Sequence, residues 1–245
     1  MLKKRAAFVA LAFLVTCTAI KAAPPDIRPA FRPPAVPLVT CDPYLSIWSM
    51  ADRLTDDTTR HWTRREHPLV SLILIDGEHY RLMGTEPKNL PAMRQVGVRV
   101  MSTRSIYDFD DEHVHVTLTF LTPALPDNLD VLARPLTYLT WNVRSVDGIA
   151  HAVSIYDSTS ALLTVNSPEQ KVAWARAATD GLTVLSVGTV EQTLLQPTRF
   201  TPSSFSAGSC GRSGGETARP LLTCFGPPSA ITRTSCGAAR RLTRS

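Results

Sequence analysis

The sequence predicts an all-β fold, specifically an antiparallel β-sandwich. Many short segments alternate apolar and polar residues with the period of two that is typical of half-buried strands. Glycine, aspartate and proline separate these segments. Strands do not alternate regularly with long helices, as they would in a protein with a parallel sheet. The 245-residue chain also has 19 prolines, which disfavour helix interiors. Its hydrophobic fraction of 44% is ordinary for a globular protein, so a packed core is expected.

Residues 1–22 have the three parts of a secretory signal peptide. Basic residues at positions 3–5 precede an uncharged, mostly apolar run over residues 6–20, and small residues and prolines follow. The run is shorter than the about 20 apolar residues that a membrane anchor needs. We therefore expect cleavage after this segment and a secreted or periplasmic protein with no membrane segment. A retained anchor and a lipoprotein site at Cys17 are less favoured alternatives, the latter because Thr16 is larger than the residue such sites prefer.

The region after the signal peptide is expected to contain one long loop and one well-defined hairpin. Residues 24–37 are rich in proline, residues 38–50 have a blurred strand pattern, and residues 52–65 are polar and charged. Apolar residues 69–75 and strand-like residues 79–83 then flank Asp76-Gly77. An Asp-Gly pair between two strands predicts a tight β-hairpin with a type I′ turn.

Seven further segments have the length and alternation of strands. They lie at residues 96–100, 114–120, 136–146, 149–155, 161–165, 172–177 and 182–187. Asp147-Gly148 predicts a hairpin between the third and fourth of these segments, and Asp180-Gly181 predicts a hairpin between the last two. Residues 189–195 favour a helix, but only weakly.

The remainder of the chain divides into three expected parts. Residues 27–84 form an N-terminal segment and residues 85–196 form a β-sandwich domain, and we expect the two to fold as one unit. The composition then changes, because residues 200–245 have no Lys, Asp, Asn, Tyr or Trp and no apolar periodicity. Such a segment buries too little surface to order itself. We expect residues 197–245 to be a disordered basic tail or, as the preferred hypothesis, the out-of-frame translation of a GC-rich gene.

The net charge of +5 does not indicate nucleic-acid binding, because the two ends of the chain carry it. Residues 197–245 contribute +6 and residues 1–22 contribute +4, which leaves −5 for the body between them. A protein that binds nucleic acid presents a basic face on its folded domain. The sequence therefore argues against a nucleic-acid partner.

An acidic stretch, residues 108–112, leads into His113 and His115. On a strand these two side chains point to the same face, and two imidazoles beside carboxylates are a metal-binding pattern. No third convergent ligand is evident, and the stretch lacks the glycine and the distal glutamate of a calcium loop. We interpret it as a solvated strand entered through an acidic loop, and we predict no metal and no cofactor.

The loop over residues 56–62 concentrates two acids with Arg60, His61 and Trp62. Loops held by a rigid sandwich commonly carry binding groups. The alternative interpretation is an ion-paired loop that a buried Trp62 pins to the core.

Several segments, in order, resemble the N-terminal region of the secreted glutaminase A-like family. They are residues 32–40 (RPPAVPLVT), residues 42–49 (DPYLSIWS), Leu54-Thr55-Asp56 with Arg60-His61-Trp62, and Ile75-Asp76-Gly77 through residues 80–84 (YRLMG). A looser similarity continues through Tyr156-Asp157-Ser158, Asp180-Gly181-Leu182 and residues 188–192. The resemblance covers roughly residues 27–196.

This resemblance implies a β-sandwich followed by an α/α-toroid domain, and hydrolysis of the glutamine side-chain amide to glutamate and ammonia. Many family members are known only as domains of unknown function. The helical domain, where the family's catalytic groups are expected, is missing from this sequence, so we assign no catalytic residue and expect a fragment that is inactive alone. Trp48, Arg60, His61 and Trp62 are candidates for a substrate-facing wall that takes a small-molecule amide. The alternatives are a structural sandwich and a carbohydrate-binding sandwich, whose tryptophans stack on a glycan ligand.

Overall fold

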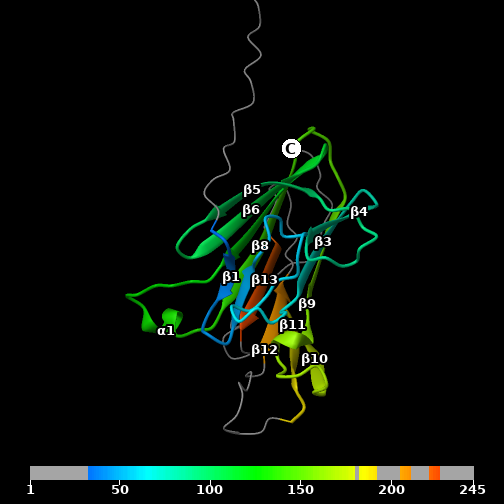
Figure 1. Ribbon diagram of the computed structural model, residues 1–245. Coiled ribbons are helices and arrows are strands. Elements are labelled where there is room, and N and C mark those ends of the chain that lie inside the picture. The colour runs from blue at the N-terminus through cyan, green and yellow to red at the C-terminus, as the bar shows by residue number, and fades with distance from the viewer. Residues whose placement is uncertain (1–32, 180–181, 192–204, 211–220, 227–245) are drawn as a thin grey trace, which may run out of the picture.

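The computed structural model describes residues 33–179, 182–191, 205–210 and 221–226, which form three antiparallel sheets (Figure 1). The all-β antiparallel sandwich expected from the sequence is confirmed. Within the described residues, helical structure is limited to the four-residue helix α1 (Leu129–Leu132) and the 3-10 turn Ala161–Leu163. No helix in these residues is long and apolar enough to cross a membrane.

The strands fall into a small ribbon and two larger sheets. The ribbon pairs β1 (Val36–Thr40) with β2 (Ser46–Ser49). The three-stranded sheet has the order β4 (Glu78–Met83), β3 (Leu69–Ile75), β9 (Val153–Thr159). The eight-stranded sheet has the order β10 (Val172–Thr179), β11 (Leu182–Thr189), β12 (Phe205–Cys210), β13 (Leu221–Gly226), β8 (Thr137–Ser145), β7 (Val114–Leu121), β6 (Arg104–Asp110), β5 (Arg94–Val100).

Two of the three predicted hairpins are present. β3 and β4 pair around Asp76 and Gly77, whose φ angles of 49° and 101° are the two positive values that a type I′ turn requires. β10 and β11 also pair as neighbours, although their turn at residues 180–181 lies outside the described residues. The hairpin predicted at Asp147-Gly148 is wrong, because β9 pairs with β3 instead of β8. Residues 146–152 therefore carry the chain from the larger sheet to the smaller one.

Three local predictions also need correction. β6 was not predicted, because the acids at its end were interpreted as a loop. A strand is expected at residues 161–165, but residues 161–163 form a 3-10 turn in which the Leu162 amide donates to the Ser160 hydroxyl. Residue 189, the start of the weakly predicted helix, ends β11, and residues 192–195 lie outside the described residues.

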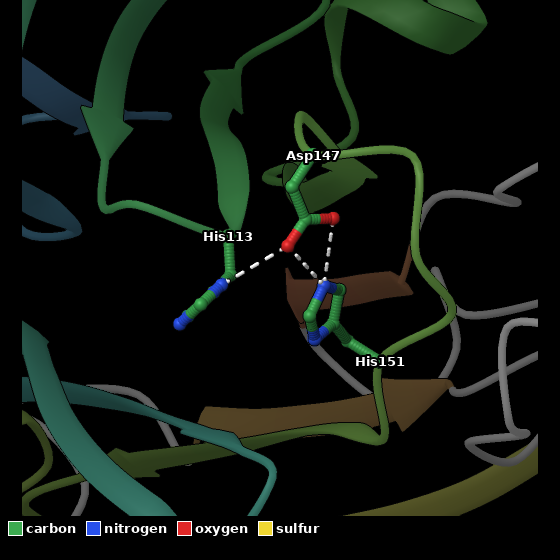
Figure 2. A group of neighbouring side chains, drawn as sticks. All are labelled: His113, Asp147 and His151. Carbon is green, nitrogen blue, oxygen red and sulfur yellow. Dashed lines mark hydrogen bonds and ion pairs between the residues drawn. The ribbon is translucent and has the colours of Figure 1, made fainter.

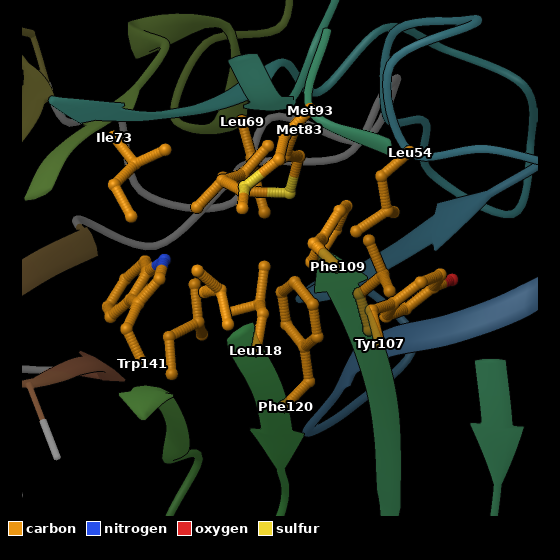
Figure 3. Packing of buried hydrophobic residues seen from close by; sticks show 14 of the residues in the cluster. Leu54, Leu69, Ile73, Met83, Met93, Tyr107, Phe109, Leu118, Phe120 and Trp141 are labelled. Carbon is orange, nitrogen blue, oxygen red and sulfur yellow. The ribbon is translucent and has the colours of Figure 1, made fainter. Parts of the chain in front are cut away.

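The core lies between the three-stranded sheet and the eight-stranded sheet, and residues of the β1–β2 ribbon also belong to it. Buried and half-buried residues alternate along β3 and β7, as the sequence pattern requires. Figure 3 shows large side chains of β6, β7 and β8 facing Leu69, Ile73 and Met83 of the smaller sheet. One polar bond crosses this interior: the indole Nε1 of Trp141 donates to the Ser71 Oγ at 3.0 Å.

Two short pieces of the C-terminal stretch are part of the larger sheet, although the sequence analysis expected no order there. β12 pairs with β11, and β13 pairs with β8, so both strands lie between the β10–β11 hairpin and the rest of the sheet (Figure 1). Residues 197–204, 211–220 and 227–245 lie outside the described residues, as do residues 1–32 with the predicted signal peptide. The hypothesis of out-of-frame translation stays a prediction.

Candidate functional site

The long connection between β2 and β3 brings Trp48 and Arg60 together. Their backbones exchange two hydrogen bonds, at 2.7 and 2.9 Å, which form an isolated bridge between β2 and the loop. The Arg60 guanidinium binds both carboxylate oxygens of Asp57, at 3.1 and 3.0 Å, and contacts Glu66 at 3.4 Å. Hydrogen bonding from Arg60 lowers the pKa of the Asp57 carboxyl. The ion pairing that the sequence predicts for this loop is confirmed.

His61 holds this loop against the preceding turn. Its ring is buried, and its Nε2 lies 2.8 Å from the carbonyl oxygen of Pro43, which only accepts hydrogen bonds. Nε2 therefore carries the proton, and Nδ1 accepts from the Thr63 hydroxyl at 2.8 Å. The ring also lies 5.2 Å from that of His67, where burial lowers the pKa to about 4. With both ring nitrogens engaged, His61 serves as a structural tie.

The two tryptophans of the region differ in exposure. Trp62 is 53% exposed and donates from its Nε1 to the Pro43 carbonyl at 2.9 Å. Trp48 is half-buried, and its Nε1 donates to the Ser46 hydroxyl at 2.7 Å. The prediction that a buried Trp62 pins the loop to the core is therefore wrong. The buried ring of His61 anchors the loop instead, and the indole of Trp62 is exposed.

An open depression of about 660 Å³ lies beside this loop. It is lined by Pro34, Ala35, Met50, Asp57, Arg60, Trp62 and Arg64. Two of the four predicted substrate-facing residues, Arg60 and Trp62, therefore share one surface, whereas Trp48 and His61 are not among its lining residues. An apolar wall with guanidinium and indole groups suits a small polar or planar ligand.

A second group of histidine and aspartate side chains lies around the β8–β9 crossover. Asp147 sits between two imidazole rings (Figure 2): its Oδ2 is 3.0 Å from His113 Nδ1, and its carboxylate oxygens are 3.0 and 3.1 Å from His151 Nε2. One ligand atom from each of the three residues lies within 4.8 Å of the others, so these side chains could hold a metal ion. His151 is 5% exposed, whereas His113 and Asp147 are exposed.

Asp76, in the β3–β4 turn, completes this group. Its Oδ2 lies 2.5 Å from His151 Nδ1, so the ring of His151 is held between two carboxylates. Hydrogen bonds to Asp76 and then to Asp147 raise the pKa of His151. The reciprocal bonds from His151 lower the pKa of both carboxyls.

This group is not evident in the sequence, because its members come from separate elements. In the sequence Asp147 predicts only a hairpin turn. The one sequence signal for the group is His151, four positions after Asp147. His113 and His115, whose metal pattern the sequence analysis set aside, do not belong to one group of side chains. His115 instead lies 2.5 Å from Asp110 and 3.5 Å from Asp108.

Asp157 is a further titratable group, placed inside the sandwich. It lies on β9 opposite Ser71 of β3, and its Oδ1 is buried with no hydrogen-bond partner in the described structure. Burial raises the pKa of this carboxyl to about 7. Strongly shifted carboxyls of this kind occur both at functional sites and in structural cores.

Two family models and one curated protein match parts of this chain. Residues 9–95 match a family described as a domain of unknown function (DUF4964), and residues 103–202 match another, DUF5127. A curated relative, glutaminase A of Aspergillus oryzae, is 30% identical over 157 residues. That similarity covers 61% of this chain and 23% of the relative, so the chain matches about a quarter of the length of that protein. The chain is thus similar to two families of unknown function and to part of a glutaminase A.

Proposed function

We propose that this chain is the β-sandwich part of an exported amidohydrolase related to glutaminase A, and that it lines or supports a substrate site without carrying the chemistry. The 30% identity to glutaminase A over 157 residues is the observation that carries this proposal. The signal-peptide pattern of residues 1–22 supports export. The resemblance to the glutaminase A-like family further implies that catalytic groups belong to a separate helical domain.

The chemistry of the depression supports binding more than hydrolysis. Cleavage of an amide needs a nucleophile, a positioned acid or base, and a donor that stabilises the oxyanion. The residues that line the depression include no Ser, Thr, Cys, Lys or His. Its carboxylate, Asp57, is engaged by Arg60, and the nearby His61 uses both ring nitrogens for structural bonds.

The same surface has groups that suit a small amide such as glutamine. Arg64 supplies positive charge for a carboxylate, since Arg60 is already paired with Asp57 and Glu66. The exposed indole of Trp62 supplies a flat apolar face for the aliphatic part of the ligand. Arg64 has a φ of 70°, a conformation that asparagine adopts more readily than most residues. Arg64→Asn therefore removes the charge with little effect on the backbone.

Ammonia release and ligand binding test this proposal together. The full chain is incubated with L-glutamine, ammonia is followed by a coupled assay, and binding is measured by NMR titration. We expect no ammonia above the buffer rate, and binding that Arg64→Asn weakens while the exposed control Arg53→Asn leaves it unchanged. Ammonia release that disappears in His61→Ala contradicts a non-catalytic role, and the absence of any glutamine binding contradicts a substrate-lining role.

Carbohydrate binding is a second candidate function, and the exposure of Trp62 favours it. An indole that is 53% exposed beside an open depression is a stacking platform for a sugar ring. A glycan array tests it, with Trp62→Ala as the variant and Trp174→Ala as a control at a 76% exposed tryptophan elsewhere. Binding that only Trp62→Ala abolishes supports this function, whereas no binding to any glycan contradicts it.

A further inference from the structure

We propose that His113, Asp147 and His151 form a binding site for one Zn²⁺ ion or a similar divalent transition metal. The three side chains come from the start of β7 and from the crossover between β8 and β9, and they converge at one point (Figure 2). No third ligand for a metal beside His113 and His115 is evident in the sequence. Asp147 and His151 supply the missing ligands once the chain is folded.

The spacing of the ligand atoms is close to that of a tetrahedral zinc site. Zinc bonds to nitrogen and oxygen of about 2.0–2.2 Å place neighbouring ligand atoms about 3.3–3.5 Å apart. The Asp147 carboxylate lies 3.0 Å from the nearest nitrogen of each ring. All three ligand atoms lie within 4.8 Å of one another, so a small rotation of the exposed His113 brings the rings together around an ion.

The surrounding bonds already hold the ligands in place. The Oδ1 of Asp147 accepts hydrogen bonds from the Ser145 hydroxyl at 3.0 Å and from the Ile149 amide at 2.9 Å. Asp76 binds the Nδ1 of His151 and leaves its Nε2 facing Asp147. Metal-binding histidines characteristically donate their other ring N–H to a carboxylate in this way.

Asp76 is held in place by a second hydrogen bond besides the one to His151. Its Oδ1 accepts from the Ala152 amide at 2.8 Å, next to His151 in the crossover. An ion at this site would therefore link the start of β7 with the crossover and, through Asp76, with the β3–β4 turn. It would join the two main sheets at one end.

The donor set determines the class of ion. Two imidazoles and one carboxylate favour Zn²⁺ and related transition metals, whereas Ca²⁺ and Mg²⁺ prefer oxygen ligands alone. Three protein ligands leave a fourth position open, and the exposure of His113 and Asp147 gives solvent access to it. In the ion-free protein, N–H protons on the two rings make the contacts to Asp147, and the ion replaces those protons.

Zinc binding to the full chain tests the proposal. The protein is stripped with a chelator, titrated with Zn²⁺ by calorimetry, and analysed for bound metal after gel filtration. We expect one ion per chain, and visible absorbance of tetrahedral intensity when Co²⁺ replaces Zn²⁺. Asp76→Asn should weaken binding by about 10–100-fold, the usual effect of losing an outer carboxylate, and His113→Ala should weaken it further.

Control variants separate this site from adventitious binding and from unfolding. His79→Ala removes another exposed histidine and should leave zinc affinity unchanged. Because His113 is exposed, His113→Ala should keep the circular dichroism spectrum of the folded protein. No zinc binding by the wild type, or equal binding by the wild type and the double variant His113→Ala/Asp147→Asn, overturns the proposal and leaves these residues as a cluster of hydrogen-bonded ion pairs.

Discussion

Replacing Asp157 with asparagine is expected to stabilise the protein at pH 8 and to change its stability little at pH 4. Asparagine keeps the size and shape of the carboxyl group but never ionises. In the folded protein the Asp157 carboxyl is buried, its Oδ1 has no hydrogen-bond partner in the described structure, and burial raises its pKa to about 7 from the ordinary 3.8. Ionisation of this group is therefore unfavourable in the folded protein.

The direction and size of the effect follow from these two pKa values. Below pH 3.8 the carboxyl is protonated in both states, and its contribution to stability is intact. As the pH rises towards 7, the unfolded chain ionises while the folded protein does not, so the free energy of unfolding falls. A difference of about three pKa units corresponds to at most about 4 kcal/mol. We expect Asp157→Asn to recover about 2–4 kcal/mol at pH 8.

Urea denaturation followed by tryptophan fluorescence measures this difference. Wild type and Asp157→Asn are unfolded at several pH values between 4 and 8, with Asp127→Asn as a control at an exposed carboxylate. The gap between the first two proteins should widen with pH, and the control should follow the wild type. A gap that is the same at pH 4 and pH 8 refutes the reasoning that burial suppresses ionisation.

Two further substitutions test contacts inside the sandwich. Ser71→Ala leaves the buried indole N–H of Trp141 without its acceptor, so we expect a loss of about 1–3 kcal/mol in urea denaturation, whereas Ser154→Ala on the exposed face of β9 should cost less than about 0.5 kcal/mol. Gly84→Ala should lower the thermal midpoint more than Gly77→Ala. Both glycines have positive φ angles, of 89° and 101°, but only at Gly84 would the new Cβ lie 2.9 Å from a backbone carbonyl oxygen. Equal losses at the two glycines would contradict the importance of that contact.

Two of the three Asp-Gly pairs, Asp76-Gly77 and Asp147-Gly148, show which part of the fold can be predicted from sequence. At Asp76-Gly77 the turn and its two strands are adjacent in the sequence, and local backbone preference is sufficient to form the hairpin. At Asp147-Gly148 only the glycine has a positive φ angle, of 77°, so this pair does not adopt the type I′ turn, which needs two positive values. The edge of β8 pairs with β13 instead, and β9 pairs with β3. Pairing of this kind depends on which strand edges are free in the assembled sheet.

β6 shows that a strand is hard to recognise in the sequence when it contains strongly charged residues. Its buried residues Ser105, Tyr107 and Phe109 alternate with residues that are less buried, so the period of two is present in the sequence. The acids at positions 108 and 110 fall on the other face, where they pair with Arg99 and Arg94 of β5. The charge belongs to the outer face of a strand that the sequence analysis treated as an acidic loop.

The candidate sites were predictable to different degrees for the same reason. Arg60 and Trp62 are near neighbours in one loop, so the sequence placed them together, and the structure assigns both to one depression. The position of His61 was predicted equally well, but its engagement with Pro43 depends on a turn 18 residues earlier. The cluster around Asp147 forms only when three elements come together in the folded protein, and a single sequence does not show which elements are close in space.

The position of β13 has a consequence for how the protein folds. Leu221 of β13 lies opposite Trp141 of β8, a partner about 80 positions earlier in the chain. Sheets that depend on such distant pairs have high contact order. They form slowly because the intervening chain must first lose conformational entropy. During synthesis from the N-terminus, β8 meets β7 early and then keeps one edge open until residues 221–226 arrive. An open edge invites pairing with another molecule. Substitutions that slow the pairing of β13 with β8 should therefore cause aggregation during production, even where they leave the stability of the folded protein unchanged.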